Sequence, residues 1–445
     1  MVAIVLLIAA TFLTFFAAKV GIQEQRMAGN DTRQKDAFAV AEALMDRSKT
    51  FLEANAPDFG SWGWQPCSGT AMPCGDGTNT VYDGTWSQVR VRDLTTSDGT
   101  GTSGNAALGG LGGEAYFLTR NPTVSGGSSE PLVLVATGSS DDGTGQAVVR
   151  QVQRRVFTVQ PGPVPPLTAP SVGVIGSFHL VGNPNHAMTA DELLQITPAN
   201  CDDFSSGSGQ MLSVWTEDNF NDLVNGVASW DICQAQFFKT NTDPLLSSKS
   251  DCFLGITTSG CGCQSTQDPM LTMCRSQNFS SSTDPNKLTA CGIKDNDPNF
   301  PDDVFAWVFG AAPADVKSRA DQVVENCNAL SATSTGLIWV TGNCKPGASQ
   351  VGSRAEPVVL VVEGELDFGA NKHVWGLVVA HNSPKVKLSG GFTIHGAMIV
   401  DSDSTVFQAN GTYNAIYDPC VFAAIFNNEE FVEYAPVEGS WSDQL

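Results

Sequence analysis

The segment KDNDPNFPDD, residues 294–303, carries the clearest candidate ligand set in the sequence. Asp295, Asp297 and Asn299 alternate within it, and oxygen-bearing side chains at alternate positions are typical of calcium loops. The segment lacks the central glycine and the closing glutamate of an EF-hand, so the match is incomplete. The segment therefore gives a weak calcium prediction, and we predict no other metal and no cofactor.

Histidines and nucleophiles give little sign of catalysis. The sequence contains no phosphate-binding loop, haem-attachment motif, metalloprotease helix or serine nucleophile elbow. His373 and His395 fall at similar places in two apolar segments, which predicts that they stack, facing solvent, in a structural role. We therefore do not expect the protein to be an enzyme. The five histidines are His179, His186, His373, His381 and His395.

The 12 cysteines indicate an oxidising compartment. Cys67 and Cys74 close a short loop and are the only pair that the sequence itself connects. The pattern C-x8-C-x-C-x10-C, with no histidine nearby, is not a usual zinc spacing, so we expect disulfides. A zinc site is the alternative, formed by Cys252, Cys261, Cys263 and Cys274.

The composition limits the class of protein and its partners. The net charge of −22 argues against binding nucleic acid through a basic face. Only 16% of the residues are charged and 44 are glycines, a composition that favours β-rich, turn-rich domains. A chain of 445 residues has room for two or three domains.

The elements that position these residues begin with a long helix. Residues 1–18 are apolar apart from two threonines, and an uncharged run of this length is about the minimum for a membrane span. The pattern of helix formers continues without a break to Asn55, which predicts one helix of roughly 80 Å. Its lower part carries an apolar stripe at steps of mostly three and four residues. The stripe comprises Ala37, Ala41, Leu44, Met45 and Leu52.

The segment 21–48 then provides a family resemblance. It contains the core E-x-R-M-A-G-N, residues 24–30, followed by A-F-x-x-A-E-A, residues 37–43. This pattern resembles the N-terminal signature of the PilX-type minor pilins of the type IV pilin superfamily, and a weaker similarity covers the C-terminal ninety or so residues. The matching positions are Glu24, Arg26, Met27, Ala28, Gly29, Asn30, Ala37, Phe38, Ala41, Glu42 and Ala43.

The resemblance implies a life cycle for the helix. It implies that the apolar segment is held in the inner membrane, that a prepilin peptidase processes the chain, and that other pilin subunits then replace lipid around the helix. If Met1 is the mature terminus, it follows an unseen glycine and is N-methylated. The helix residues expected in the filament core are Val5, Phe12, Phe15, Phe16, Glu24 and Arg26.

Val5 departs from the pattern of most major pilins. Those proteins carry a glutamate at the fifth mature residue, where it neutralises the terminal amine of the neighbouring subunit. A buried amine without its carboxylate is costly, so a subunit with Val5 is best placed at the filament tip.

The remainder of the chain reads mainly as β-structure. Residues 56–160 form a pilin-type β domain, in which Tyr82 to Val159 alternates as an antiparallel sheet with a hairpin turn at Asp142-Gly143. Residues 161–170, PGPVPPLTAP, are interpreted as a stiff linker and a domain boundary.

Residues 171–335 are interpreted as a strand followed by a cysteine-rich insertion with helices at Asp303 to Phe309 and Pro313 to Leu330. Residues 336–445 repeat short apolar strands. Aligning Trp375-Gly376 with His395-Gly396 gives a twenty-residue period, with Asn414-Ala415 nineteen further on. This period predicts a β-solenoid, and a twisted β-sandwich is the alternative.

Aromatic side chains also lie in polar loops. Trp62, Trp64 and Trp441 sit among small polar residues, so they are candidate contact platforms for carbohydrate or protein. For the first two, packing of the disulfide loop on the sheet is the favoured interpretation.

The combined prediction is an α+β protein: a pilin helix on a small antiparallel sheet, followed by a large β-rich, solenoid-like domain with a disulfide-rich insertion. The expected function is that of a structural subunit of a type IV pilus-like filament, exposed on the cell surface for assembly initiation, adhesion or aggregation. A major subunit of an extracellular filament and a large pseudopilin of a type II secretion system are the alternatives.

Overall fold

The computed structural model describes residues 2–55, 62–94, 103–120, 131–170, 174–205, 211–217, 229–243, 249–256, 260–264, 274–275, 285–401, 406–428, 431–437 and 439–444. These residues form two compact units. Unit 1 contains the described residues up to Val156 and those from Glu433 onward, and unit 2 contains those from Phe157 to Val432. Unit 2 is thus inserted in the sequence of unit 1.

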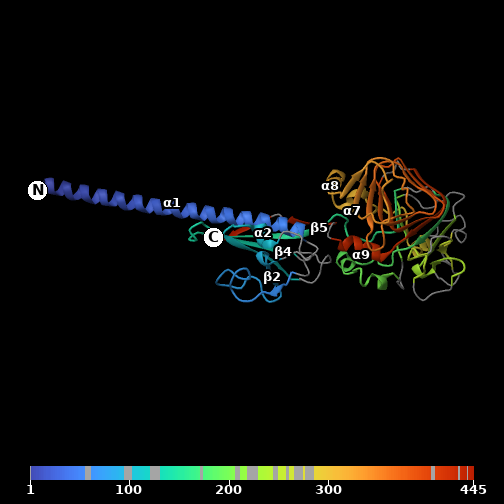
Figure 1. The fold of residues 1–445 in the computed structure, drawn as a ribbon, viewed down its shortest axis with the longest axis horizontal. Helices are drawn as coiled ribbons and strands as arrows, with labels where there is room; N and C mark the ends of the chain where they lie inside the picture. Colours follow the sequence, from blue (N-terminus) through green and yellow to red (C-terminus); the bar gives the residue numbers. More distant parts are fainter. Residues whose placement is uncertain are drawn as a thin grey trace. The chain divides into compact units, whose positions relative to one another are not determined.

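Unit 1 is built on the helix α1 (Val2–Ala54) (Figure 1). Its 53 residues include Gly21 and Gly29, and the helix passes through both without a break. The predicted stripe is confirmed, because Ala37, Ala41 and Leu44 are fully buried on the sheet of the unit.

An antiparallel sheet covers this stripe, with its strands in the order β1-β2-β3-β4-β5-β22 and with β23 also on β5. The predicted hairpin is confirmed: β4 and β5 pair antiparallel around the turn at Asp142-Gly143. The strands are β1 (Gln65–Pro66), β2 (Ser87–Arg90), β3 (Gly113–Thr119), β4 (Leu132–Ser139), β5 (Gln146–Phe157), β22 (Val432–Pro436) and β23 (Ser442–Gln444), with the helices η2 (Val91–Asp93) and α2 (Gly104–Leu108) between β2 and β3.

Helix and sheet approach closely at Gly138 of β4. A Cβ atom at this position would lie 2.1 Å from the backbone oxygen of Ala37 and 2.5 Å from the backbone nitrogen of Ala41. Only glycine allows this distance, since any side chain would push the helix away from the strand.

Unit 2 contains a 14-stranded sheet whose pairs are parallel. Its strands are β6 (Leu167–Thr168), β7 (Val174–Val181), β8 (Val214–Trp215), β9 (Ser229–Cys233), β12 (Ile293–Lys294), β13 (Gln322–Val324), β14 (Gly336–Val340), β15 (Gln350–Val351), β16 (Val358–Val362), β17 (Leu366–Phe368), β18 (His373–Ala380), β19 (Lys385–Ser389), β20 (Phe392–Val400) and β21 (Val406–Ile416). A two-stranded pair is formed by β10 (Phe238–Lys239) and β11 (Gly262–Cys263).

The helical elements of unit 2 are short. They are α3 (Ala190–Leu194), η3 (Cys201–Phe204), η4 (Ala235–Phe237), α6 (Pro285–Ala290), α7 (Val304–Phe309), α8 (Pro313–Ser318) and α9 (Pro419–Asn427). The predicted helix to Phe309 is confirmed, with Asp303 as its N-cap. The helix predicted to reach Leu330 is wrong in length: α8 ends at Ser318, and β13 follows.

The parallel strands stack in register, as a solenoid requires and a sandwich does not. The predicted alignment of Trp375-Gly376 with His395-Gly396 is confirmed. The predicted alignment of Asn414-Ala415 with His395-Gly396 is wrong, because Asn414 pairs with Thr393 and not with His395. The two stacked glycines are required: a Cβ on Gly376, at φ +144°, would lie 1.8 Å from the oxygen of Val358.

One buried ladder shows how far the solenoid extends. Aligned apolar residues on seven successive strands, all at most 3% exposed, stack on one another through the core. They are Ile338, Leu360, Val378, Met398, Leu167, Val214 and Ile293.

The predicted domain boundaries therefore need correction. Leu167 belongs to the proline-rich segment, and Val214 and Ile293 to the supposed insertion, yet all three complete the solenoid core. The proline-rich segment is a buried part of unit 2 and not a linker, because Leu167 and its neighbours fill a rung. At the other end the solenoid does not extend to residue 445, since β23 pairs with β5 of unit 1.

All 12 cysteines form disulfides, so the zinc alternative is wrong: its four sulfurs are already bonded in pairs. The predicted pair Cys67–Cys74 is confirmed. The other pairs are Cys201–Cys420, Cys233–Cys263, Cys252–Cys261, Cys274–Cys291 and Cys327–Cys344.

Candidate assembly helix

The N-terminal part of α1 exposes apolar side chains on every side. Val5, Phe12, Phe15 and Phe16, all predicted to be in a filament core, are 65–72% exposed. Within the described chain, α1 is the one helix long and apolar enough to cross a membrane, and none of its most apolar window is buried. Met1, the predicted methylation site, lies outside the described residues.

The polar groups of this segment are satisfied within the helix itself. Thr14 donates its hydroxyl hydrogen bond to the carbonyl oxygen of Ala10 at 3.0 Å, and Thr11 bonds back to Leu7 in the same way. Beyond the first turn, where the leading N–H groups have no acceptor within the helix, the backbone groups are also paired internally, so residues 6–18 carry no polar group that needs water. The segment is therefore suited to lipid or to an apolar surface formed by other helices.

Three charged side chains follow the apolar segment. Lys19, Glu24 and Arg26 are exposed, and among the described residues none of them has an ion-pair partner. Glu24 and Arg26, also predicted site residues, are two positions apart and point to different sides of the helix. The structure thus leaves these charges available to another molecule.

The next turns attach the helix to its own unit. Lys35 lies 2.7 Å from Asp31, and this hydrogen bond raises the pKa of Lys35. Arg33 Nε lies 2.7 Å from Asp142 Oδ2 in the β4–β5 turn. Hydrogen bonds from Thr144 and Ser140 hold the pKa of Asp142 well below its usual range, so this contact is ionised at neutral pH.

The candidate calcium residues have structural partners in the described chain. Asp297 Oδ1 accepts hydrogen bonds from the backbone and the side chain of Asn299, both at 3.0 Å, and Oδ2 accepts one from Trp215 Nε1 at 2.9 Å. Lys294 Nζ lies 3.3 Å from the same Oδ2. Both carboxylate oxygens of Asp297 thus stabilise this turn, and the calcium site at Asp295, Asp297 and Asn299 stays a prediction.

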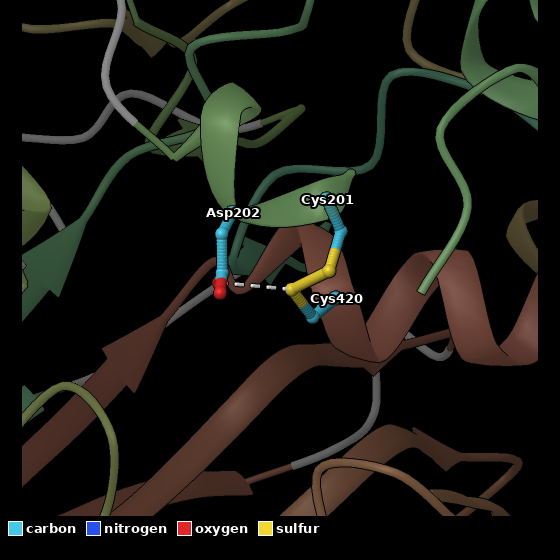
Figure 2. Close-up of side chains that lie close together, drawn as sticks. All are labelled: Cys201, Asp202 and Cys420. Carbon is cyan, nitrogen blue, oxygen red and sulfur yellow. Dashed lines mark hydrogen bonds between the residues drawn. A yellow bond between two sulfur atoms is a disulfide. The ribbon is translucent and has the colours of Figure 1, made fainter. Parts of the chain in front are cut away.

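Figure 2 shows the one place in the described residues where three potential metal-ligand atoms gather: Cys201, Asp202 and Cys420. The two sulfurs form a disulfide and are not available as thiolates, so this cluster is not a metal site. Asp202 is instead paired with Lys249 and Arg354, the latter at 2.7 Å. Burial alone would raise the pKa of Asp202, but these two hydrogen bonds outweigh it and lower the pKa.

The same cluster contains an interaction that sequence reasoning missed. Arg354 binds the fully buried Asp418 through two hydrogen bonds of 2.7 and 3.1 Å, and Asp418 also caps α9 through the backbone nitrogen of Cys420. The sequence signal was the dipeptide Asp418-Pro419, a typical helix start. Nothing in the sequence marks Arg354, which is 64 residues away, as the partner of Asp418.

The histidine prediction is confirmed in part. The rings of His373 and His395 stack with centroids 5.6 Å apart, and Trp375 stacks on His395 at 3.7 Å. Both histidines are buried, so the expectation that they face solvent is wrong. Burial is also the main cause that lowers the pKa of each of them.

The tryptophans have different environments. Trp62 is buried and stacks on Phe117 at 5.3 Å, which confirms that its role is packing. Trp64 stacks on Trp62 at 6.2 Å. Trp441 is 43% exposed and contacts Phe38 of α1 edge to face at 5.7 Å. Of the three, Trp441 has the largest exposed surface.

Comparisons with known proteins give little beyond this geometry. No family model matches the chain, and no curated protein matches it. Among solved structures, the competence-associated pilin ComZ from Thermus thermophilus matches with 12% sequence identity, over 93% of this chain and 98% of that chain, at a TM-score of 0.23.

Proposed function

We propose that this protein is a subunit of a type IV pilus-like filament, of the PilX type. The observation that carries the proposal is the contrast within α1: its lower half is buried on the sheet of unit 1, whereas residues 4–16 expose apolar side chains all round. One helix thereby combines an anchor to its own domain with a surface that water solvates poorly.

The physical reason is the cost of exposed apolar surface. Each large side chain removed from water contributes about 1.5–3 kcal/mol, and the exposed segment contains Phe12, Phe15, Phe16 and several leucines. These side chains can be removed from water first in a bilayer and later by packing against the helices of other subunits. Pilin subunits, the inner membrane before assembly and a prepilin peptidase are accordingly the proposed partners, and the assembled filament lies on the cell surface.

Position in the filament is a second part of the proposal. Val5 lacks the carboxylate that would neutralise a neighbour's terminal amine, which favours a tip position. A position repeated along the shaft and a role as a secretion pseudopilin are the alternatives. Unit 2 would serve assembly initiation, adhesion or aggregation, by burying surface rather than by catalysis, and the net charge of −22 opposes a nucleic-acid partner.

Electron microscopy of purified filaments, labelled with an antibody against unit 2, tests the proposal. Label at filament ends favours the tip, and label along the whole length favours the shaft. A secretion defect on deletion, without surface filaments, favours the pseudopilin. The proposal fails if the protein is found free outside cells with its first twenty or so residues removed by signal peptidase.

A matched pair of variants links that result to the helix. Leu13→Arg places a charge on a side chain that is 72% exposed within unit 1, so we expect normal folding but loss of membrane retention and of filament incorporation. Thr50→Arg adds the same charge at an exposed position of the lower half and serves as the control. Normal incorporation of the Leu13→Arg chain would contradict the proposal.

A further inference from the structure

Charged residues on the upper half of α1 repeat at steps of seven. Lys19, Arg26 and Arg33 are one such series, and Glu24 and Asp31 are another. Seven residues of an α-helix turn through about 700°, so each series drifts only about 20° per step and forms a column along the helix. We call the first series the basic column and the second the acidic column.

The two columns lie on nearly opposite sides of the helix. Five residues separate Lys19 from Glu24, a rotation of about 140°. Members of the two columns therefore differ by roughly 120–180° around the axis. The basic column also points in the direction of the buried stripe, because Ala37 is four residues beyond Arg33. The acidic column consequently points away from the sheet of the same unit.

The upper members of both columns have no partner within the described chain. A salt bridge along one helix needs residues three or four apart, whereas Lys19 and Glu24 are five apart and Glu24 and Arg26 are two apart. The lower members are already engaged, Arg33 with Asp142 and Asp31 with Lys35, both at 2.7 Å. Lys19, Glu24 and Arg26 are thus three exposed charges next to an apolar segment.

We propose that the acidic column of one copy binds the basic column of a second copy, in a parallel, head-to-tail contact that repeats along the filament. The inference rests on the proposed function, whose filament brings the upper helices together. Opposite charges on opposite sides of one helix are complementary to a second copy of the same helix, and such a contact does not close on itself. It therefore favours a subunit repeated along the shaft over the tip position that Val5 suggests.

The spacing also sets the offset between neighbouring helices. A shift of five residues, about 7.5 Å, places Glu24 beside Lys19 and Asp31 beside Arg26 of the second copy. A shift of two residues in the other direction, about 3 Å, would place Glu24 beside Arg26, but it would leave Lys19 without a partner and place Asp31 beside Arg33, which Asp142 already occupies. The five-residue shift uses the free cations, so it is the register that we assign.

The surroundings make the pairing specific. Copies with a net charge of −22 repel one another, and the apolar segments alone would allow many offsets. A charge enclosed among apolar helices is costly when unpaired, so a register that leaves Lys19, Glu24 and Arg26 without partners is disfavoured. The columns thus select one register from many that bury similar apolar area.

Charge reversal in the full-length protein tests the inference. Glu24→Lys places a lysine beside Lys19 of the neighbouring copy, and Lys19→Glu places a glutamate beside Glu24 of the neighbouring copy, while both variants keep the pair of Asp31 and Arg26. We expect each chain alone to lose at least tenfold in filament yield. Expressed together, the two chains should co-assemble in alternation and recover at least half of the wild-type yield. Gln25→Lys adds a lysine outside both columns and should assemble normally.

The contact itself is read by cross-linking. A photoreactive residue at position 28, on the helix side of Glu24 and Asp31, should capture the peptide between Lys19 and Arg26 from a second, epitope-tagged copy. Oxidised electrophoretic mobility and membrane retention show that each variant is folded and inserted. Normal filaments from the Glu24→Lys chain, no recovery on co-expression, or capture of a different protein would each overturn the inference while leaving the proposed function standing. A wild-type chain that never enters filaments would overturn both.

Discussion

The two units bury their apolar residues in opposite ways. Unit 1 places one helix on an antiparallel sheet that the chain leaves after Val156 and completes with β22 and β23. Unit 2 stacks parallel strands on one another and holds its covering loops with five of the six disulfides. Packing of α1 on the sheet therefore stabilises unit 1, whose helix is proposed to enter a filament, whereas disulfides stabilise the irregular loops of unit 2.

Chemical reduction of the disulfides should produce the largest difference in stability between the two units. Each disulfide contributes roughly 2–4 kcal/mol to the unfolding free energy. Reducing the five disulfides of unit 2 should therefore destabilise that unit far more than reducing Cys67–Cys74 destabilises unit 1. We expect hydrogen exchange in detergent, before and after reduction, to rise in β16 much more than in β4. The variant Cys67→Ser/Cys74→Ser is the control and should leave unit 2 protected. Equal loss of protection in both units would contradict the comparison.

Truncating a core leucine in each unit gives the next largest effect. Leu44→Ala removes a fully buried side chain between α1 and the sheet, so unit 1 should lose about 2–5 kcal/mol of unfolding free energy. Leu360→Ala should act similarly on unit 2 alone. Leu13→Ala, on the exposed half of the same helix, should change the unfolding free energy in detergent little. Urea titration, followed by hydrogen exchange in each unit, measures the unfolding free energy of all three variants. An equal loss of unfolding free energy in the Leu13 and Leu44 variants would contradict the division of α1 into an exposed half and a buried half.

The features predicted from the sequence are those written in local patterns. The stripe through Ala37 and Leu44 and the alignment of Trp375 with His395 depend on residues that recur at a period of the structure, and the turn at Asp142-Gly143 depends on a dipeptide with its own turn preference. The exposed apolar half of α1 was also predicted, because Val5 and Phe12 lie in a run without any charge.

The features that escaped prediction depend on contacts between distant, short segments. Strands of two residues, such as Leu167–Thr168 and Ile293–Lys294, carry no periodicity, yet they complete the solenoid core. The return of Ser442 to pair with Arg150 joins residues almost 300 positions apart, and nothing local marks it. The disulfide Cys201–Cys420 was missed for the same reason, since spacing connects only nearby cysteines.

Enlarging Gly138 should produce an intermediate effect that is confined to unit 1. Gly138→Ala places a Cβ 2.1 Å from the oxygen of Ala37, so α1 must move away from β4 at a cost of roughly 1–3 kcal/mol. Gly110→Ala, in the same unit, meets nothing within 4 Å and is the matched control. Urea unfolding of both variants measures the difference. Equal stability of the two variants would show that the close approach of helix and strand does not contribute to the stability of unit 1.

Lowering the pH should destabilise unit 2 before unit 1, and we expect this effect to be the smallest of those predicted. His373 and His395 are buried with ring nitrogens 3.4 Å apart, and burial lowers the pKa of both below the usual value of about 6.5. The unfolded chain therefore binds more protons than the folded one below pH 6.5 or so, and stability falls as the pH drops. We expect the unfolding free energy of unit 2 to fall between about pH 7.5 and pH 5.0, and the buried His179, whose pKa is lowered to about 4 mainly by burial, adds to this loss. His373→Gln removes one of these protonation sites and the repulsion between His373 and His395, so its loss over the same range should be smaller. An unchanged loss in that variant would assign the acid sensitivity to other groups.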